Sequence, residues 1–123
     1  MGLDISLNVR NRAYEEIAYF RKVNFLVKFI ETYYAGRELE NCEPFEIDKE
    51  GILELKDRCI KVLEDHTLAK ELLPTQEGFF FGNTDYNSAY YEDVAKVLDK
   101  CDEILERFES LQPDEYITFD IWY

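Results

Sequence analysis

Four residues of the chain are of the types that bind zinc. Cys59 and His66 are seven positions apart, so on a helix they would share one face, two turns apart. Cys101 falls on the apolar stripe of a later helical segment, and Cys42 lies in a loop region. Three thiolates and one imidazole form a common zinc ligand set, so one hypothesis is a zinc site made by these four residues. The alternative is that Cys59 and Cys101 are small core residues.

The other residues offer little for catalysis. The chain has one histidine, and it carries no phosphate-binding glycine loop. Neither a Ser-His-Asp set nor a two-histidine metal motif is therefore assembled. We expect a protein that is not an enzyme and that requires no cofactor. A small metal-dependent enzyme or a zinc-stabilised domain is the alternative.

Acidic residues are concentrated in the last two-thirds of the chain. Residues 1–37 hold 4 Asp and Glu against 6 Lys and Arg, and residues 38–123 hold 23 against 8. The net charge of −13 therefore divides into +2 and −15. A dense negative surface repels nucleic acid and membranes and attracts basic protein surfaces. We expect a protein partner, with no direct binding to nucleic acid or membranes.

Cysteine usage and hydropathy bear on the location of the protein. The three cysteines are an odd number without the spacing of a disulfide framework, which is typical of a reducing compartment. No stretch approaches 18 uninterrupted apolar residues, and no secretory signal pattern opens the chain. These features favour the cytoplasm.

The last helical segment carries a row of acids beside its apolar stripe. This row contains Glu92, Asp99, Asp102, Glu103, Glu106 and Glu109, interrupted by Lys96, Lys100 and Arg107. Successive helical turns are ~5.4 Å apart, a spacing comparable to that of phosphates along a DNA strand. Such carboxylates are candidates to imitate DNA in a basic groove. The alternative is an ordinary solvated helix face.

An aromatic loop precedes this helix. Gly78 to Gly82 enclose three consecutive phenylalanines, and tyrosines follow. Three adjacent Phe side chains cannot all point inward, so we expect Phe80 or Tyr86 to be an aromatic anchor for a protein partner. The alternative is that the loop closes one end of the core.

Periodicity predicts the elements that would position these residues. Alternating apolar residues predict strands over 3–9 and 117–123, which we expect to pair. Helical spacing predicts helices over about 11–35, 48–65 and 87–111, with a short helical turn at 68–73. We therefore expect one α+β domain over residues 1–123, mostly helical. Its three main helices would pack on a small antiparallel sheet formed by the N- and C-terminal strands.

Several motifs resemble those of a known family of small, acidic, uncharacterised proteins of phages, prophages and their bacterial hosts. The matching pieces are Met1-Gly2-Leu3-Asp4, Arg21-Lys22-x-Asn24, Asn41-Cys42, Leu72-Leu73-Pro74-Thr75-x-x-Gly78-Phe79-Phe80-Phe81-Gly82-x-Thr84-Asp85-Tyr86 and the aromatic end with Trp122. The chain departs from the pattern at Val27, where members often carry a histidine, and it lacks a longer insertion after the first strand.

The resemblance implies a mobile-element origin and supplies no catalytic residues. A small acidic phage-borne protein resembles anti-CRISPR proteins in size and charge. The implied partner is a host defence enzyme, above all a Cas9-like effector that holds its heteroduplex in a basic channel. An acidic ligand in that channel would hinder DNA binding. A phage structural or regulatory protein is the remaining alternative.

Overall fold

Strands from the two ends of the chain form the middle of the sheet. The computed structural model describes residues 2–11, 14–78 and 81–123. In it, β1 (Asp4–Arg10) and β4 (Tyr116–Trp122) pair antiparallel along their whole length. Ile5, Leu7 and Val9 are buried on one face of β1, as the alternation predicted. The pairing of the terminal strands and the α+β class are confirmed.

The helix predicted over 11–35 is wrong in its first half. Residues Glu15–Arg21 instead form strand β2, which pairs antiparallel with β1. Ala18 and Phe20 are buried and the residue between them is exposed, so burial alternates as in a strand. A β-bulge interrupts the pairing with β1. The extra residue shifts the period of two, which is why the segment also fits helical spacing.

The second half of that prediction is confirmed. Helix α1 (Asn24–Ile30) is buried on nearly every side and continues into a π-helical segment, η1 (Glu31–Ala35). Gly36 ends it with φ of 65°, a left-handed conformation in which a glycine is not strained. Strand β3 (Pro44–Ile47), which lies in the predicted loop, pairs with β4. The sheet order is β2-β1-β4-β3, so the sheet has two strands more than predicted.

The two longest helices begin at the caps that the sequence indicates. Asp48 accepts a hydrogen bond from the Gly51 N–H (2.9 Å) at the start of α2 (Lys49–Glu64), and Asn87 accepts one from Tyr90 at the start of α4 (Ser88–Glu109). Between them lie the 3-10 turn η2 (His66–Leu68) and α3 (Ala69–Leu72). The prediction that His66 shares a helix face with Cys59 is wrong, because α2 ends at Glu64 and His66 is exposed in the turn that follows.

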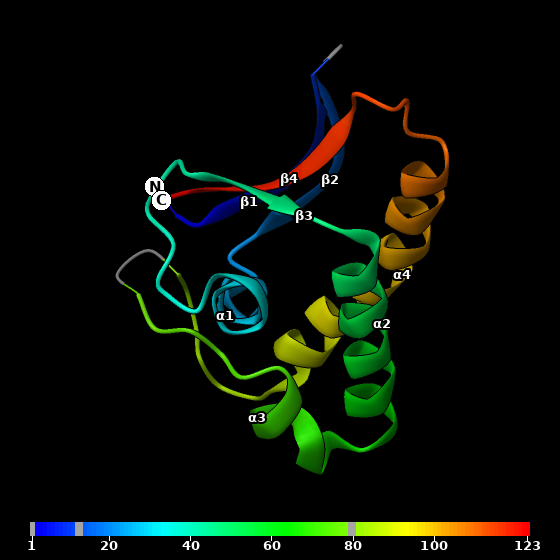
Figure 1. Ribbon diagram of the computed structural model, residues 1–123. Coiled ribbons are helices and arrows are strands. Elements are labelled where there is room, and N and C mark those ends of the chain that lie inside the picture. The colour runs from blue at the N-terminus through cyan, green and yellow to red at the C-terminus, as the bar shows by residue number, and fades with distance from the viewer. Residues whose placement is uncertain (1, 12–13, 79–80) are drawn as a thin grey trace.

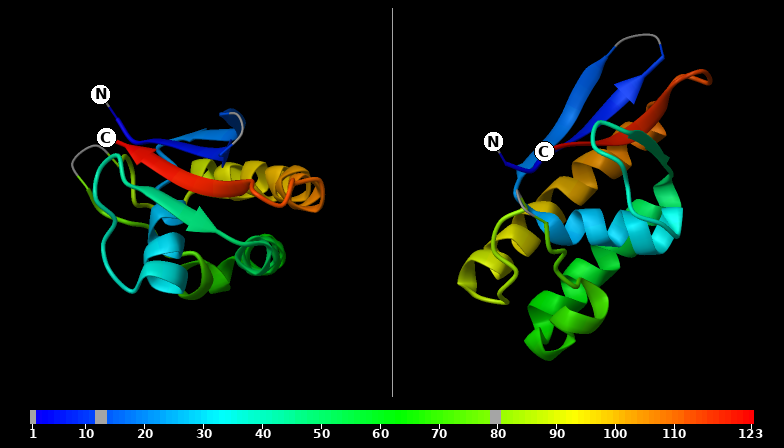
Figure 2. Two further views of the ribbon diagram at one scale, coloured as in Figure 1. Left: turned by 45° about the horizontal axis from the view of Figure 1, so that its top comes forward. Right: turned by 90° about the vertical axis from the view of Figure 1, so that its left-hand side faces the viewer.

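The helices cover one face of the sheet. Figure 1 shows α1, α2 and α4 on the same side of the strands, and Figure 2 shows this layer from two further directions. The core lies between them, with Leu7 and Phe119 of the sheet opposite Leu26, Ile52 and Val97 of the helices. No helix of the described residues covers the other face of the sheet. We call it the open face, and it presents the side chains of Asp4, Ser6, Asn8 and Arg10 on β1 and those paired with them.

Candidate functional site: the acidic helix and the open sheet face

The six predicted acidic residues of α4 are all exposed. The buried side of this helix is formed by Tyr90, Val94, Val97, Cys101 and Ile104, so the prediction that Cys101 lies on its apolar stripe is confirmed. Residues seven apart on a helix return to almost the same direction. Glu92, Asp99 and Glu106 therefore form one line, about opposite the buried side, and we call these three residues the acidic stripe.

Lysines divide the α4 carboxylates into two groups. Asp102 pairs with Lys56 of α2 (2.6 Å), Glu103 pairs with Lys100 of α4 (2.9 Å), and Glu109 pairs with Lys49. The three residues of the acidic stripe have no ion-pair or hydrogen-bond partner in the part of the chain that the structure describes. Their charges are therefore the least neutralised on this helix.

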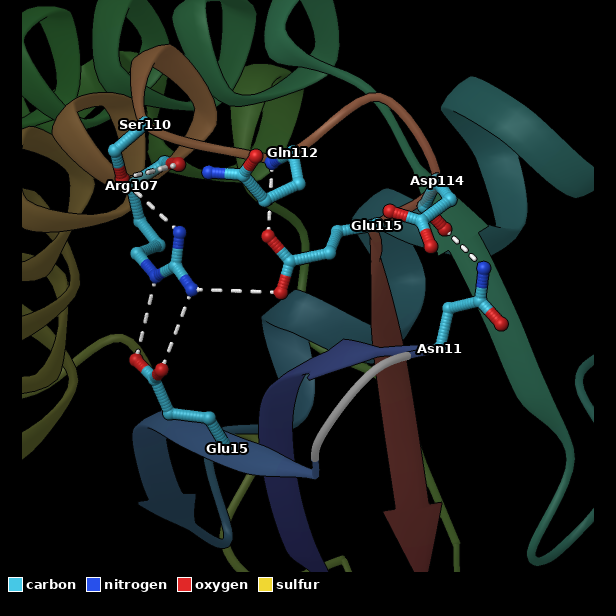
Figure 3. Close-up of polar contacts among 7 residues, drawn as sticks. All are labelled: Asn11, Glu15, Arg107, Ser110, Gln112, Asp114 and Glu115. Atoms are coloured by element: carbon cyan, nitrogen blue, oxygen red, sulfur yellow. Dashed lines mark hydrogen bonds and ion pairs between the residues drawn. The ribbon is translucent and has the colours of Figure 1, made fainter.

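Arg107 interrupts the row of acids for a structural reason. Its guanidinium donates from Nε and Nη2 to the two carboxylate oxygens of Glu15 on β2, each at 3.3 Å, and it donates from Nη1 to Ser110 (3.0 Å). Glu115, before β4, lies 3.8 Å from Nη2. Figure 3 shows these contacts joining the end of α4 to the β1–β2 hairpin and the start of β4. This arginine therefore positions α4 against the sheet rather than neutralising the acidic stripe.

The four zinc candidates lie in different surroundings. Cys59 and Cys101 are fully buried in the core, on α2 and α4. Cys42 is exposed in the loop before β3, where its N–H donates to Ile121 O. His66 stacks on Tyr91 with ring centroids 3.7 Å apart. Within residues 2–11, 14–78 and 81–123, no three His, Cys, Asp or Glu side chains are grouped to hold a metal ion. Zinc binding stays a prediction, which elemental analysis of the purified protein measures.

The cysteines should differ sharply in reactivity. Burial raises the pKa of the Cys101 thiol to about 12, with Asp102 adding to the effect and Lys56 opposing it. Burial also raises the pKa of Cys59, and the neighbouring Cys101 adds to this. Since the thiolate is the reactive form, only the exposed Cys42 should react with a thiol reagent such as Ellman's reagent in the folded protein. All three should react in denaturant. Rapid reaction of more than one thiol under native conditions would contradict the packing of Cys59 and Cys101.

The aromatic loop is partly accounted for. Phe81 is buried, with its ring edge-to-face against Tyr123 at 5.0 Å. Tyr86 is half-buried, and its hydroxyl accepts a hydrogen bond from the Thr75 N–H (3.1 Å). These two residues therefore hold the loop against the body of the protein, as the core-closing alternative proposed. Phe80, the other predicted anchor, lies outside the described residues.

Asn24, which ends the motif Arg21-Lys22-x-Asn24 quoted above, is a central residue of this region. It is buried at the start of α1, where its Nδ2 donates to Phe81 O (3.1 Å) and Asn83 O (3.0 Å). Its Oδ1 accepts from the Gln76 N–H (3.1 Å). One side chain thus joins both arms of the loop between Pro74 and Asn87 to the first helix. Its place in Arg21-Lys22-x-Asn24 was a signal, because a polar residue in an apolar helix needs partners.

The open face carries a polar network that the sequence reading missed. Asp120 of β4 is at its centre, because it accepts hydrogen bonds from Asn8 (2.5 Å), Thr118 (2.9 Å) and Arg10 (3.1 Å). Arg10 also donates from Nε to Thr118 (2.8 Å). Asn8 and Thr118 are buried although no helix covers them. Alternation along both terminal strands placed these residues on one face, but the sequence did not indicate that they would bind each other.

Comparisons with known proteins leave the family open. No family model, no curated protein and no solved structure matches the chain. Among the described residues, no helix is long and apolar enough to cross a membrane. The arguments for function therefore rest on the two surfaces above.

Proposed function

We propose that this chain is a phage-encoded, non-enzymatic inhibitor that binds a basic, nucleic-acid-binding surface of a host defence protein through the acidic stripe. The observation that carries the proposal is the alignment of Glu92, Asp99 and Glu106 on one side of α4, exposed and without cationic partners among the described residues. The specific partner that we propose is a CRISPR effector nuclease of the Cas9 type, acting in the host cytoplasm.

The dimensions of the stripe suit an elongated basic groove. At a rise of ~1.5 Å per residue, neighbouring carboxylates of the stripe are about 10 Å apart along the axis and its ends about 21 Å apart. A Cas9-type channel contacts the backbone of its heteroduplex with positive charge along its length. An acidic helix can occupy part of such a channel without matching each phosphate. Attraction between the opposite charges would also accelerate association.

The surroundings of the only histidine favour binding over acid–base catalysis. His66 is exposed, and its ring stacks on Tyr91. Cys59 and Cys101 are buried, and their raised pKa values disfavour the thiolate form. These contacts support packing roles for His66, Cys59 and Cys101, which leaves Cys42 as the one exposed thiol.

Charge reversal of the stripe tests the proposal. The variant Glu92→Lys/Asp99→Lys/Glu106→Lys should inhibit DNA cleavage by guide-loaded Cas9 at least about tenfold more weakly than the wild type, because repulsion replaces attraction. The matched control is Glu64→Lys/Glu77→Lys/Asp85→Lys, which changes the net charge equally at other exposed positions. The control should keep most of the inhibition. Equal loss in both variants would show that net charge, and not the stripe, determines binding.

A further inference from the structure

A hollow on the open face collects the most exposed aromatic rings of the described chain. It has a volume of about 420 Å³ and lies over β1, β2 and the end of β4. Trp122, Tyr14 and Tyr19 line it and are 69%, 67% and 51% exposed, more than any other large hydrophobic residue among those described. Exposed apolar surface gathered in one place is typical of an interaction site.

The same hollow is lined by more acids than bases. Asp4, Glu16 and Asp120 contribute carboxylates, and Arg10 contributes the guanidinium. Arg10 is already bound, since it donates to Asp120 (3.1 Å) and Thr118 (2.8 Å). Asp4 accepts hydrogen bonds from Tyr19 and Arg21. Glu16 is exposed and has no ion-pair partner in the described part of the chain. An incoming cation would therefore find one free carboxylate beside the aromatic rings.

Arg10 shows which chemical group suits this surface. Its guanidinium carbon lies 5.4 Å from the centre of the Tyr14 ring while its Nη2 pairs with Asp120. A guanidinium between a ring face and a carboxylate combines cation–π attraction with charge-assisted hydrogen bonds. Planar guanidinium groups stack on aromatic rings better than ammonium groups do. Tyr19 and Trp122 line the same hollow as Glu16 and Asp4, and together they offer the same kinds of partner to a second guanidinium.

A buried acceptor on this face also lacks a donor. Asn8 is fully buried, and its Nδ2 donates to Ser6 (2.9 Å) and Asp120 (2.5 Å), both of which line the hollow. Its Oδ1 accepts no hydrogen bond in the structure as described. Buried acceptors are usually satisfied. Asn8 does not itself line the hollow, so it supports the polar floor through Ser6 and Asp120 and is not a contact for a bound ligand.

From these observations we infer that the open face binds an arginine side chain of a partner protein, with the guanidinium held by the rings of Tyr19 and Trp122 and the carboxylate of Glu16. The negative charge of the hollow disfavours nucleic acid and anionic lipid. A protein segment carrying arginine fits both its charge and its rings. This surface lies on the sheet and does not include the acidic stripe of α4, so it is tested independently of that stripe.

Trp122 is the only tryptophan of the chain, so its fluorescence reports directly on the hollow. The probe is the peptide acetyl-Arg-Gly-Arg-Gly-Arg-amide, titrated into the full chain. Its neutral control replaces each arginine with citrulline, which keeps the shape and removes the charge. We expect a saturable fluorescence change with the arginine peptide, and about three- to fivefold weaker binding by Glu16→Gln.

The matched variant is Glu64→Gln, which removes one negative charge from the end of α2, outside both the hollow and the acidic stripe. It should bind the arginine peptide as the wild type does. The inference is overturned if the arginine peptide leaves Trp122 fluorescence unchanged, or if the citrulline peptide produces the same response. Equal weakening by Glu16→Gln and Glu64→Gln would also overturn it. Both residues are exposed, so neither variant should disturb folding.

Discussion

Replacing Asn24 with alanine should lower the free energy of unfolding by about 3 kcal/mol. The substitution removes three hydrogen bonds, and it leaves the carbonyls of Phe81 and Asn83 and the N–H of Gln76 without their partner. Leaving a buried donor or acceptor without its partner costs about 1–3 kcal/mol. Removing both members of a hydrogen-bonded pair costs less, because no unsatisfied group is left behind. The effect should be largest in the loop between Pro74 and Asn87, because Asn24 joins both of its arms to α1.

Hydrogen exchange locates this effect. The Gln76 amide should be protected in the wild type and should exchange much faster in Asn24→Ala, while amides in the middle of α4 should change far less. Asn83→Ala is the control, since the side chain of this exposed residue bonds only to the Asp85 N–H. Urea unfolding gives the total loss. A stability within about 0.5 kcal/mol of the wild type would contradict the role assigned to Asn24.

The substitution Gly51→Ala should destabilise the protein by about 2–3 kcal/mol, although alanine is the better helix former. A Cβ at this position would lie 1.3 Å from the Tyr34 hydroxyl oxygen and 2.1 Å from its Cζ. The Tyr34 ring would have to leave its place. It would then lose the hydrogen bond to Asp48 (2.8 Å) and its packing against Phe45, where the ring centroids are 5.9 Å apart.

A double-mutant cycle separates the clash from helix propensity. In a Tyr34→Ala background the obstacle is gone, so Gly51→Ala should become neutral or stabilise the protein by up to about 1 kcal/mol. The sign of the effect thus depends on the residue at position 34. Urea unfolding of the four proteins measures it. A destabilisation of equal size in both backgrounds would show that Tyr34 is not the cause.

These two positions show what sequence patterns predict well and what they do not. The caps Asp48 and Asn87 are local signals, since each side chain bonds to a backbone N–H three residues ahead, and both helix starts were predicted. The close approach of Tyr34 to Gly51 is a contact between η1 and α2, and no periodic pattern in the sequence indicates it. The same holds for Asn24, whose partners are 52 to 59 positions away in the chain.

The first hairpin shows how tertiary pairing changes the reading of a local pattern. Ile17 and Phe20, three residues apart, fit a helical stripe when the segment is considered alone. The segment is instead a strand, with Ala18 and Phe20 buried, because β1 has a second edge that β2 completes. The bulge in that pairing then hides the alternation. The missed strand also concealed the hollow of the open face, since Tyr19 and Glu16 belong to β2.

The acidic row of α4 was predicted in full, because a long helix with a clear apolar stripe fixes which residues face solvent. Which of its charges are neutralised could not be predicted. Lys49 and Lys56 come from α2, and their contacts with Glu109 and Asp102 depend on how the two helices pack. Only the structure shows that Asp102, Glu103 and Glu109 are paired with lysines while the acidic stripe has no such partner among the described residues.

Competition with DNA tests the proposed function most directly. The measurement is the binding of a labelled target duplex to guide-loaded Cas9 at increasing concentrations of this chain. Our account predicts that the apparent dissociation constant for DNA rises with the chain concentration, and that the charge-reversed stripe variant needs at least about a tenfold higher concentration for the same rise. It also predicts a weaker effect at high salt, where the attraction is screened. DNA affinity that stays constant in a large excess of the chain would contradict the account.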